Sequence, residues 1–326
     1  MADPYRIATF AAPLSRDGPG LLLRDIQRGD DPQLTAIQAI IARHAPDVLV
    51  LTDFDYDLDG LALAAFAATL GPDYPHRFAL QPNAGLATGF DLDGNGRLGE
   101  ARDAHGYGRF AGDGGMAVLS RFPIVETQVT DLSAMLWKEV PGATLPQVAG
   151  AAFPSAAAQD ILRVSSTGHW IVPLALPDGT ALSLLVFSAT PPVFDGPEDM
   201  NGLRNRDELR LWQAVFDGDF GAVPPSFVVA GNANLDPNGG AGYTEAMAAF
   251  LRHPLLQDPL PDKNTADWPE DGPGKLRVSY VLPSADWTVM DAGVFWPAPD
   301  EPERTLTGDD GLAAGPHHFV WVDISG

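Results

Sequence analysis

The sequence predicts a mixed α/β protein, because strand and helix patterns alternate along the chain from its beginning. Tyr5–Phe10 alternates in polarity and is typical of a strand. Asp31–His44 places apolar side chains at a helical spacing, and Asp47–Leu51 is an apolar run that predicts a buried strand. A strand, a long helix and a second strand in this order suit a βαβ-like unit.

Strands and helices continue to alternate in the rest of the chain. Leu61–Leu70 is rich in Ala and predicts a short helix, and Met116–Ser120 begins a strand. The further predicted strands are His169–Ala175, Ala181–Phe187, Phe227–Ala230, Leu276–Leu282, Val289–Phe295 and His318–Ile324, with helices at Asn205–Phe216 and Tyr243–Leu251.

Two long stretches lack a regular period. Gln81–Gly115 is rich in Gly and Asp and is expected to be a long ordered loop, while Pro141–Ser166 has the character of an insertion. We find no repeat, no low-complexity tract and no linker, so the sequence predicts one domain over residues 1–326.

Composition excludes several classes of function. The chain has no cysteine, which rules out disulfides, thiolate metal sites and a cysteine nucleophile. Its formal net charge is −23, so nucleic acid is not an expected partner, and neither is a membrane surface recognised by a basic patch. No apolar run is long enough to span a membrane. The first residues lack the features of a signal peptide, so we expect a cytoplasmic protein, or an exported one if a leader has been removed.

The most informative segment follows a predicted strand. Phe227–Ala230 is an apolar run that stops at Gly231, and the short polar side chains of Asn232, Asn234 and Asp236 come directly after it. In α/β folds such strand ends build active sites. The alternative is an Asn-rich turn without further function.

Three other strand ends have the same character: Ala11 follows the first strand, Asp53 follows the second, and His317 precedes the last. Their order and spacing resemble the endonuclease/exonuclease/phosphatase superfamily, which has the DNase-I-like fold, and in particular a bacterial subgroup of it. The segments that carry the resemblance are GGMAVLSRFPI (Gly114–Ile124), TPPVFDGPED (Thr190–Asp199), SYVLPS (Ser279–Ser284) and HHFVWVDI (His317–Ile324).

This resemblance covers nearly the whole chain and implies both a fold and a reaction. The fold is a four-layer sandwich, in which two mostly antiparallel β-sheets pack face to face with helices outside. The reaction is hydrolysis of a phosphoester that depends on Mg²⁺, a hard ion that prefers oxygen ligands.

The positions that carry this chemistry in the family are mostly replaced here. Asn234 and His317 keep the family residue, and Asp53 keeps the charge of a Glu. The family's Asn, His and three Asp residues are replaced by Ala11, Ser188, Asn232, Ser279 and Pro316, respectively. Because metal ligands and His–Asp partners act as a unit, we expect an impaired or inactive enzyme that holds Mg²⁺ poorly.

Two other functions remain open. The first is an active phosphoesterase with a remodelled site built from Asp53, Asn234, Asp236 and His317. The second is an acidic protein that is stabilised by calcium and acts by binding an unidentified ligand or protein partner.

The calcium hypothesis depends on the segment DLDGNGRLGEARD. Asp91, Asp93 and Asn95 fall at positions one, three and five of an EF-hand-like loop. Position twelve is Arg102 rather than Glu, which excludes a full EF-hand, but Glu100 or Asp103 could complete a looser site. The alternative is a solvated acidic turn.

Four further residues are candidates for substrate or anion binding. His169 lies at a strand start and is either a pocket residue or a hydrogen-bonded core histidine. Arg204, Asn205 and Arg206 are predicted to lie at a helix start, where they could bind an anion or form a salt-bridged helix entry.

Overall fold

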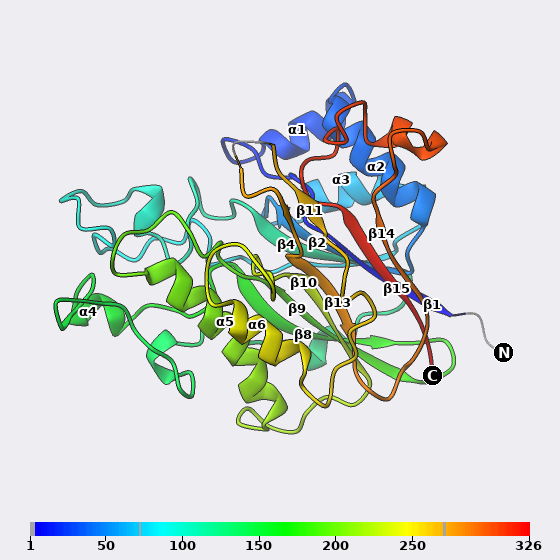
Figure 1. Ribbon diagram of the computed structural model, residues 1–326. Helices are drawn as coiled ribbons and strands as arrows, with labels where there is room; N and C mark the ends of the chain where they lie inside the picture. The colour runs from blue at the N-terminus through cyan, green and yellow to red at the C-terminus, as the bar shows by residue number, and fades with distance from the viewer. Residues whose placement is uncertain (1–3, 72, 270–271) are drawn as a thin grey trace.

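The computed structural model describes residues 4–71, 73–269 and 272–326. Residues 1–3, which are part of the segment compared with a signal peptide, lie outside the described residues. Most strands belong to two sheets (Figure 1). The larger sheet contains, in spatial order, β14 (Thr288–Phe295), β15 (Phe319–Ser325), β1 (Tyr5–Phe10), β2 (Val48–Phe54), β4 (Gly115–Ser120) and β3 (His76–Phe78).

The second sheet has five strands. Their order is β13 (Ser279–Pro283), β10 (Phe227–Asn232), β9 (Ala181–Ser188), β8 (Gly168–Ala175) and β5 (Thr130–Asp131). Within the two sheets, the pairs β1–β2 and β9–β10 are parallel and the others are antiparallel. Two small hairpins pair β6 (Gln147–Val148) with β7 (Ala151–Ala152) and β11 (Ala266–Asp267) with β12 (Lys275–Leu276).

The main core lies between the two sheets. On β2, Val48 and Val50 face this core, while Leu49 and Leu51 face the helices on the other side. This division follows from the two-residue period of a strand. A strand covered on both faces needs apolar side chains at every position, which is why this segment is a continuous apolar run.

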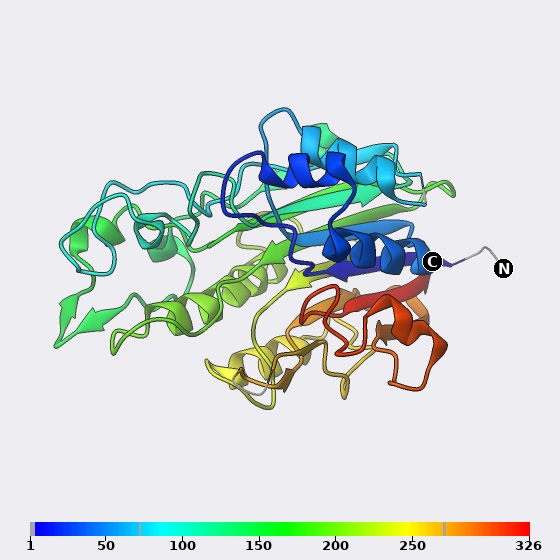
Figure 2. The ribbon, with the colours of Figure 1, turned by 90° about the horizontal axis from the view of Figure 1, so that it is seen from above.

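Helices cover the outer face of each sheet. The larger sheet carries α1 (Leu21–Arg28), α2 (Pro32–His44) and α3 (Leu61–Thr69), and the other carries α5 (Met200–Phe216) and α6 (Thr244–Leu251). Figure 2 shows these layers from above. The predicted four-layer sandwich of two mostly antiparallel sheets is therefore confirmed. None of the helices in the described ranges has the length and apolar character needed to cross a membrane.

Several local predictions need correction. Helix α5 begins at Met200 rather than Asn205, and helix α1 has no counterpart among the predicted elements. The predicted strand Leu276–Leu282 is two strands with different partners, since β12 pairs with β11 and β13 pairs with β10. Between them, the Arg277 amide donates to Asp236 (2.6 Å). The predicted insertion contains α4 (Ala156–Gln159), and single-turn helices occur at η1 (Ala101–Asp103), η2 (Glu126–Gln128), η3 (Trp137–Glu139) and η4 (Pro302–Leu306).

The loop over residues 81–115 is ordered, as expected, by polar contacts with neighbouring loops. The side-chain amide of Asn83 donates to the carbonyls of Ser133 (2.7 Å) and Ser165 (2.8 Å). It also accepts a hydrogen bond from Arg163 (2.7 Å). One buried amide thus ties three segments of the chain together.

We expect Gly231→Ala to destabilise the protein by about 2 to 3 kcal/mol, because overpacking in a close-packed core has this cost. A Cβ at position 231 would lie 1.9 Å from the carbonyl oxygen of Phe187 on the paired strand β9. Gly239→Ala is the control, since a Cβ there meets nothing within 4 Å. Urea unfolding measures both free energies, and equal values for the two variants would contradict the prediction.

Candidate functional site

The strand ends predicted to converge line one pocket of about 290 Å³, here called the inner pocket. Strands β1 and β2 are parallel and so end at the same edge, as do β9 and β10. The residues that line the inner pocket are Ala11, Thr52, Asp53, Tyr107, Gly114, Ser166, Thr167, Ser188, Ala189, Thr190, Pro191, Asn232, Asn234 and His317.

Two of the substituted family positions lie just outside this lining. Ser279 is buried and pairs with Asn232 across β13 and β10. Pro316 precedes His317, and its carbonyl accepts a hydrogen bond from the Asp267 amide (2.8 Å). The structure therefore places all the positions named for the family resemblance in or beside the inner pocket. Asp236, which belongs to the remodelled-site hypothesis, does not line this pocket.

Asp53 occupies an unusual backbone position. Its φ is 67°, in the left-handed region that Asp and Asn tolerate better than most residues, and it lies at a register shift between Thr52 and Phe54. Burial raises the pKa of its carboxyl to about 7; a hydrogen bond from Ser15 lowers it, while Asp55 raises it. At neutral pH this carboxyl is therefore close to half protonated.

The two asparagines of the inner pocket bind each other. The side-chain amide of Asn232 donates to the Asn234 oxygen (3.1 Å), and the Asn234 backbone amide donates to the Asn232 oxygen (3.2 Å). The Asn234 side chain also donates to the Ala189 carbonyl (2.8 Å). Each side-chain oxygen accepts one of these bonds and each side-chain nitrogen donates one, so every amide keeps donor and acceptor capacity for a ligand.

His317 has no charged partner among the described residues. Its Nδ1 atom is buried without a hydrogen-bond partner in those residues, and its ring packs edge-on against Trp268 with 5.2 Å between ring centroids. Burial lowers its pKa to about 4. The imidazole is therefore neutral at pH 7, and Pro316 supplies no carboxylate to orient it.

The inner pocket does not fit the metal of the family's chemistry. Among the described residues that line it, Asp53 is the single carboxylate and no Lys or Arg is present. Mg²⁺ prefers ionised oxygen ligands in a regular octahedron. One carboxylate, with Ala11 in place of an Asn, supplies too few strong oxygen donors to hold this ion firmly.

A buried acid that the sequence did not reveal holds the walls of the inner pocket. One oxygen of Glu208, in α5, accepts hydrogen bonds from the Ser166 amide (2.6 Å) and hydroxyl (2.7 Å), and the other accepts from the Thr190 amide (2.7 Å). Burial raises the pKa of Glu208 to about 7. An acid in a charged helix usually faces solvent, so no sequence signal marked this one.

His169 lies in the core. It is wholly buried, and its ring nitrogens contact the Ser165 hydroxyl (2.7 Å) and the Glu208 carbonyl (3.0 Å). Burial lowers its pKa to about 3, so the ring is neutral. Of the two interpretations of His169, the core histidine is the one that its surroundings support.

The three residues of the predicted anion site do not lie at the start of α5. Because the helix begins at Met200, Arg204, Asn205 and Arg206 lie inside it. Arg204 is buried and donates to backbone carbonyls such as that of Val164 (3.0 Å). The Asn205 amide donates to two further carbonyls, and Arg206 pairs with the neighbouring Asp207 (2.9 Å).

The acidic loop predicted to bind calcium brings three carboxylates together. Asp91, Asp93 and Asp103 each place an oxygen within 4.8 Å of the others, so they could hold a metal ion. The Asp91 oxygens also accept backbone amides of residues 94–96. The Asn95 side-chain amide donates to Glu100 (2.6 Å) and to Asp93 (3.1 Å). Two of the predicted calcium ligands, Asn95 and Glu100, are therefore hydrogen-bonded to each other.

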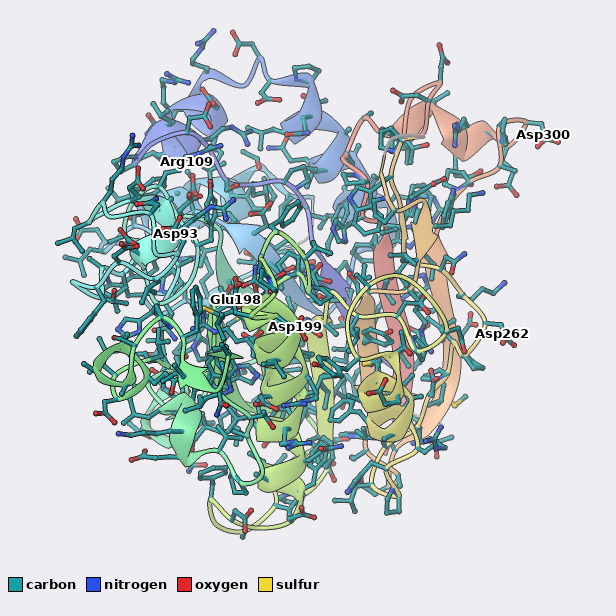
Figure 3. All side chains as sticks on the ribbon, turned by 60° about the vertical axis from the view of Figure 1, so that its left-hand side comes forward. Asp93, Arg109, Glu198, Asp199, Asp262 and Asp300 are labelled. Carbon is teal, nitrogen blue, oxygen red and sulfur yellow. The ribbon has the colours of Figure 1, made fainter. Side chains whose placement is uncertain are left out.

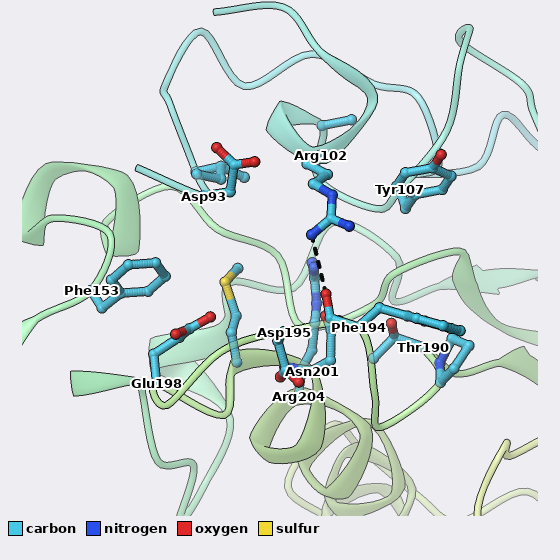
Figure 4. A pocket seen from close by; sticks show the side chains of 14 residues that line it. Asp93, Arg102, Tyr107, Phe153, Thr190, Phe194, Asp195, Glu198, Asn201 and Arg204 are labelled. Carbon is cyan, nitrogen blue, oxygen red and sulfur yellow. Dashed lines mark hydrogen bonds between the residues drawn. The ribbon is translucent and has the colours of Figure 1, made fainter. Parts of the chain in front are cut away.

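A larger pocket of about 430 Å³, here called the outer pocket, adjoins the inner one (Figure 4). Its lining is Leu92, Asp93, Arg102, Ala104, Tyr107, Phe153, Thr190, Pro191, Phe194, Asp195, Glu198, Met200, Asn201 and Arg204. Tyr107, Thr190 and Pro191 line both pockets, so the two lie next to each other. No sequence pattern indicated this pocket, because its walls come from segments that are distant in the chain.

Comparison with known proteins agrees with this arrangement of strands and pocket. A profile of the Endonuclease/Exonuclease/phosphatase family matches residues 25–309. The chain belongs to this family. No curated protein sequence matches the chain significantly.

Solved structures share the fold at low sequence identity. An endonuclease/exonuclease/phosphatase from Beutenbergia cavernae is 17% identical, with a TM-score of 0.57, over 99% of this chain and 72% of that one. Sphingomyelinase C from Streptomyces griseocarneus is 17% identical, with a TM-score of 0.54, over 99% of both chains. A family protein from Leptotrichia buccalis is 13% identical, with a TM-score of 0.57, over 99% of this chain and 100% of that one.

We expect Asp53→Asn to stabilise the protein at alkaline pH. The pKa of Asp53 is raised in the folded state, so its contribution to stability is fully present below pH 4 and is lost as the pH rises through about 7. Asn cannot ionise and tolerates a left-handed backbone. Above pH 8 the variant should exceed the native protein by on the order of 2 kcal/mol, with a smaller difference at pH 5.

Urea unfolding between pH 5 and pH 9 checks this expectation. Asp300→Asn is the control, because residue 300 is exposed and the same substitution there should shift stability little at any pH. Parallel stability–pH curves for the native protein and Asp53→Asn would refute a buried, protonated carboxyl.

Proposed function

We propose that this chain is a catalytically impaired member of the endonuclease/exonuclease/phosphatase family that acts by binding a ligand. The observation that carries the proposal is the chemistry of the inner pocket, where the family's charged groups are replaced by neutral ones. The shared core between the two sheets supports treating residues 1–326 as one domain.

The inner pocket lacks the charged groups that phosphoester hydrolysis needs. Phosphoester hydrolysis requires positive charge to stabilise the phosphoryl oxygens and a base to activate water. The described lining of the inner pocket has no Lys or Arg, His317 is neutral at pH 7, and Ser188 stands where the family has a His. A serine without a base beside it does not accept a proton at neutral pH. A neutral polar pocket suits recognition through hydrogen bonds rather than phosphoryl transfer.

The alternative is an active phosphoesterase with a remodelled site, and one of its four proposed residues, Asp236, has another role. Asp236 accepts backbone amides of Asn238 (2.7 Å), Gly239 (3.1 Å) and Arg277 (2.6 Å), which is the role of a turn-stabilising residue. It does not line the inner pocket. The alternative then depends on Asp53, Asn234 and His317 alone.

We expect no hydrolysis above background of p-nitrophenyl phosphate, bis-p-nitrophenyl phosphate or DNA with Mg²⁺, Mn²⁺ or Ca²⁺. The physical reason is the absence of a charged catalytic set in the inner pocket. Release of nitrophenol and gel analysis of DNA measure this. Turnover that a chelator stops and that His317→Ala abolishes would favour the remodelled site.

A rescue experiment sharpens the same prediction. Restoring the family residues together should create Mg²⁺-dependent activity, because they act as a unit, while single changes should not. The combined variant carries Ala11→Asn, Asp53→Glu, Ser188→His, Asn232→Asp, Ser279→Asp and Pro316→Asp. Thermal melting confirms that each variant is folded before its activity is compared.

A second candidate function, calcium-dependent stabilisation of an acidic binding protein, is favoured by the three clustered carboxylates of the acidic loop. Oxygen ligands at this density are what Ca²⁺ prefers. Mg²⁺ is less suited, because it demands a more regular geometry.

We expect Ca²⁺ to raise the melting temperature, because an ion that binds only the folded state stabilises it by about 2.7 kcal/mol at one hundred times its Kd. Differential scanning fluorimetry with 0 to ~10 mM Ca²⁺ covers the weaker end of known protein sites. Asp93→Asn should remove the shift, whereas Asp219→Asn, at an exposed position outside the loop, should keep it. An unchanged melting temperature in the native protein would exclude the site.

A further inference from the structure

We propose that the outer pocket binds an organic cation with an aromatic or aliphatic body, whose apolar part extends toward the inner pocket. This deepens the proposed binding function and rests on it in one respect, that the ligand is held rather than hydrolysed.

The wall of the outer pocket is apolar and partly aromatic. Leu92, Met200 and Phe153 line it. Tyr107 and Phe194 lie on the same side of the pocket as Thr190, which also lines the inner pocket (Figure 4). Phe194 is 76% exposed and Tyr107 is 63% exposed, so both rings are open to solvent at the pocket. Aromatic side chains left open beside a cavity are suited to cover a ligand's apolar body.

The backbone holds Phe194 in place at a conformational cost. Its φ is 70°, in the left-handed region that a bulky residue rarely adopts. The Arg102 guanidinium donates to the Phe194 carbonyl (3.1 Å), and the Asn201 side chain donates to the carbonyl of Val193 (2.7 Å). Strain of this kind persists where surrounding contacts enforce it, and it commonly marks binding sites. The backbone that carries the ring is therefore held in place before any ligand arrives, which reduces the entropy lost on binding.

The charges in the outer pocket favour a cation. Asp93, Asp195 and Glu198 line it, and none of them forms a salt bridge with any described residue. Of its two arginines, Arg204 is buried and donates to backbone carbonyls. Arg102 remains as the one accessible positive group among the lining residues. The net charge of −23 adds a long-range attraction for cations and a repulsion for anions.

The charges are also separated along the pocket. Figure 4 shows Asp93, Phe153 and Glu198 around one end, Tyr107 and Phe194 at the other, and Arg102 between them. Figure 3 shows that Asp93 and Glu198 come from different segments, the acidic loop and the chain entering α5. A carboxylate beside an aromatic ring suits an organic cation, because the ring face adds cation–π attraction to the ionic one. The cationic end is therefore assigned to Glu198 and Phe153.

Three probes with the same ring and different charges test this assignment. Isothermal titration in the presence of EGTA compares benzyltrimethylammonium, benzyl alcohol and benzenesulfonate with the full chain. The chelator keeps a divalent ion from neutralising Asp93. We expect the ammonium compound to bind more tightly than the alcohol, and the sulfonate to show no binding. Higher salt should weaken the ammonium compound, because screening reduces the attraction.

Variants locate the site. Glu198→Gln and Phe153→Ala should each weaken binding of the ammonium compound by roughly 3- to 30-fold, the range that cation–π and exposed ionic contacts span. Glu126→Gln and Phe220→Ala remove the same side-chain types at exposed positions outside the pocket and should leave the affinity unchanged. Melting curves verify that all four variants are folded.

The outcomes separate this inference from the proposed function. Equal binding of the sulfonate, no binding at millimolar ammonium compound, or full affinity in both Glu198→Gln and Phe153→Ala would overturn the inference. Because the probes contain no phosphoester, these results do not depend on turnover. A protein that binds the ammonium compound yet hydrolyses phosphodiesters would refute the impaired-enzyme proposal and leave the cation site standing.

Discussion

The fold depends on the packing of two sheets whose inner faces share one apolar core. This packing covers the central strands on both sides, since helices lie against their outer faces. Such strands cannot carry polar side chains along their length, so polar groups occur where the strands end. The parallel pairs β1–β2 and β9–β10 then place those ends at one edge. The position of the inner pocket follows from this constraint, whatever residues line it.

Elements that follow one simple rule could be predicted from the sequence. Strand β2 is a continuous apolar run because both of its faces are buried. Helix α2 begins after Asp31, whose side chain accepts the amides of Gln33 and Leu34, with Pro32 at the first helical position. In each case local chemistry and tertiary packing favour the same structure.

Prediction failed where tertiary contacts override local pattern. The first turn of α5 contains polar residues and Gly202, so it has no apolar period that would predict a helix. It is held by Arg204 and Asn205, which are buried and donate to loop carbonyls. The convergence of Asp53 and His317 in one pocket followed from the order of strands. Their protonation did not, because it depends on burial, which a single sequence does not reveal.

One aspartate belongs to two neighbouring features of the surface. Asp93 is part of the carboxylate cluster of the acidic loop and also lines the outer pocket. A divalent ion held by that cluster would neutralise a charge that attracts an organic cation a short distance away. By thermodynamic reciprocity, each ligand would then weaken the other by the same factor. The shared carboxylate makes the two occupancies antagonistic, so the ionic composition of the surroundings would set how readily the pocket fills.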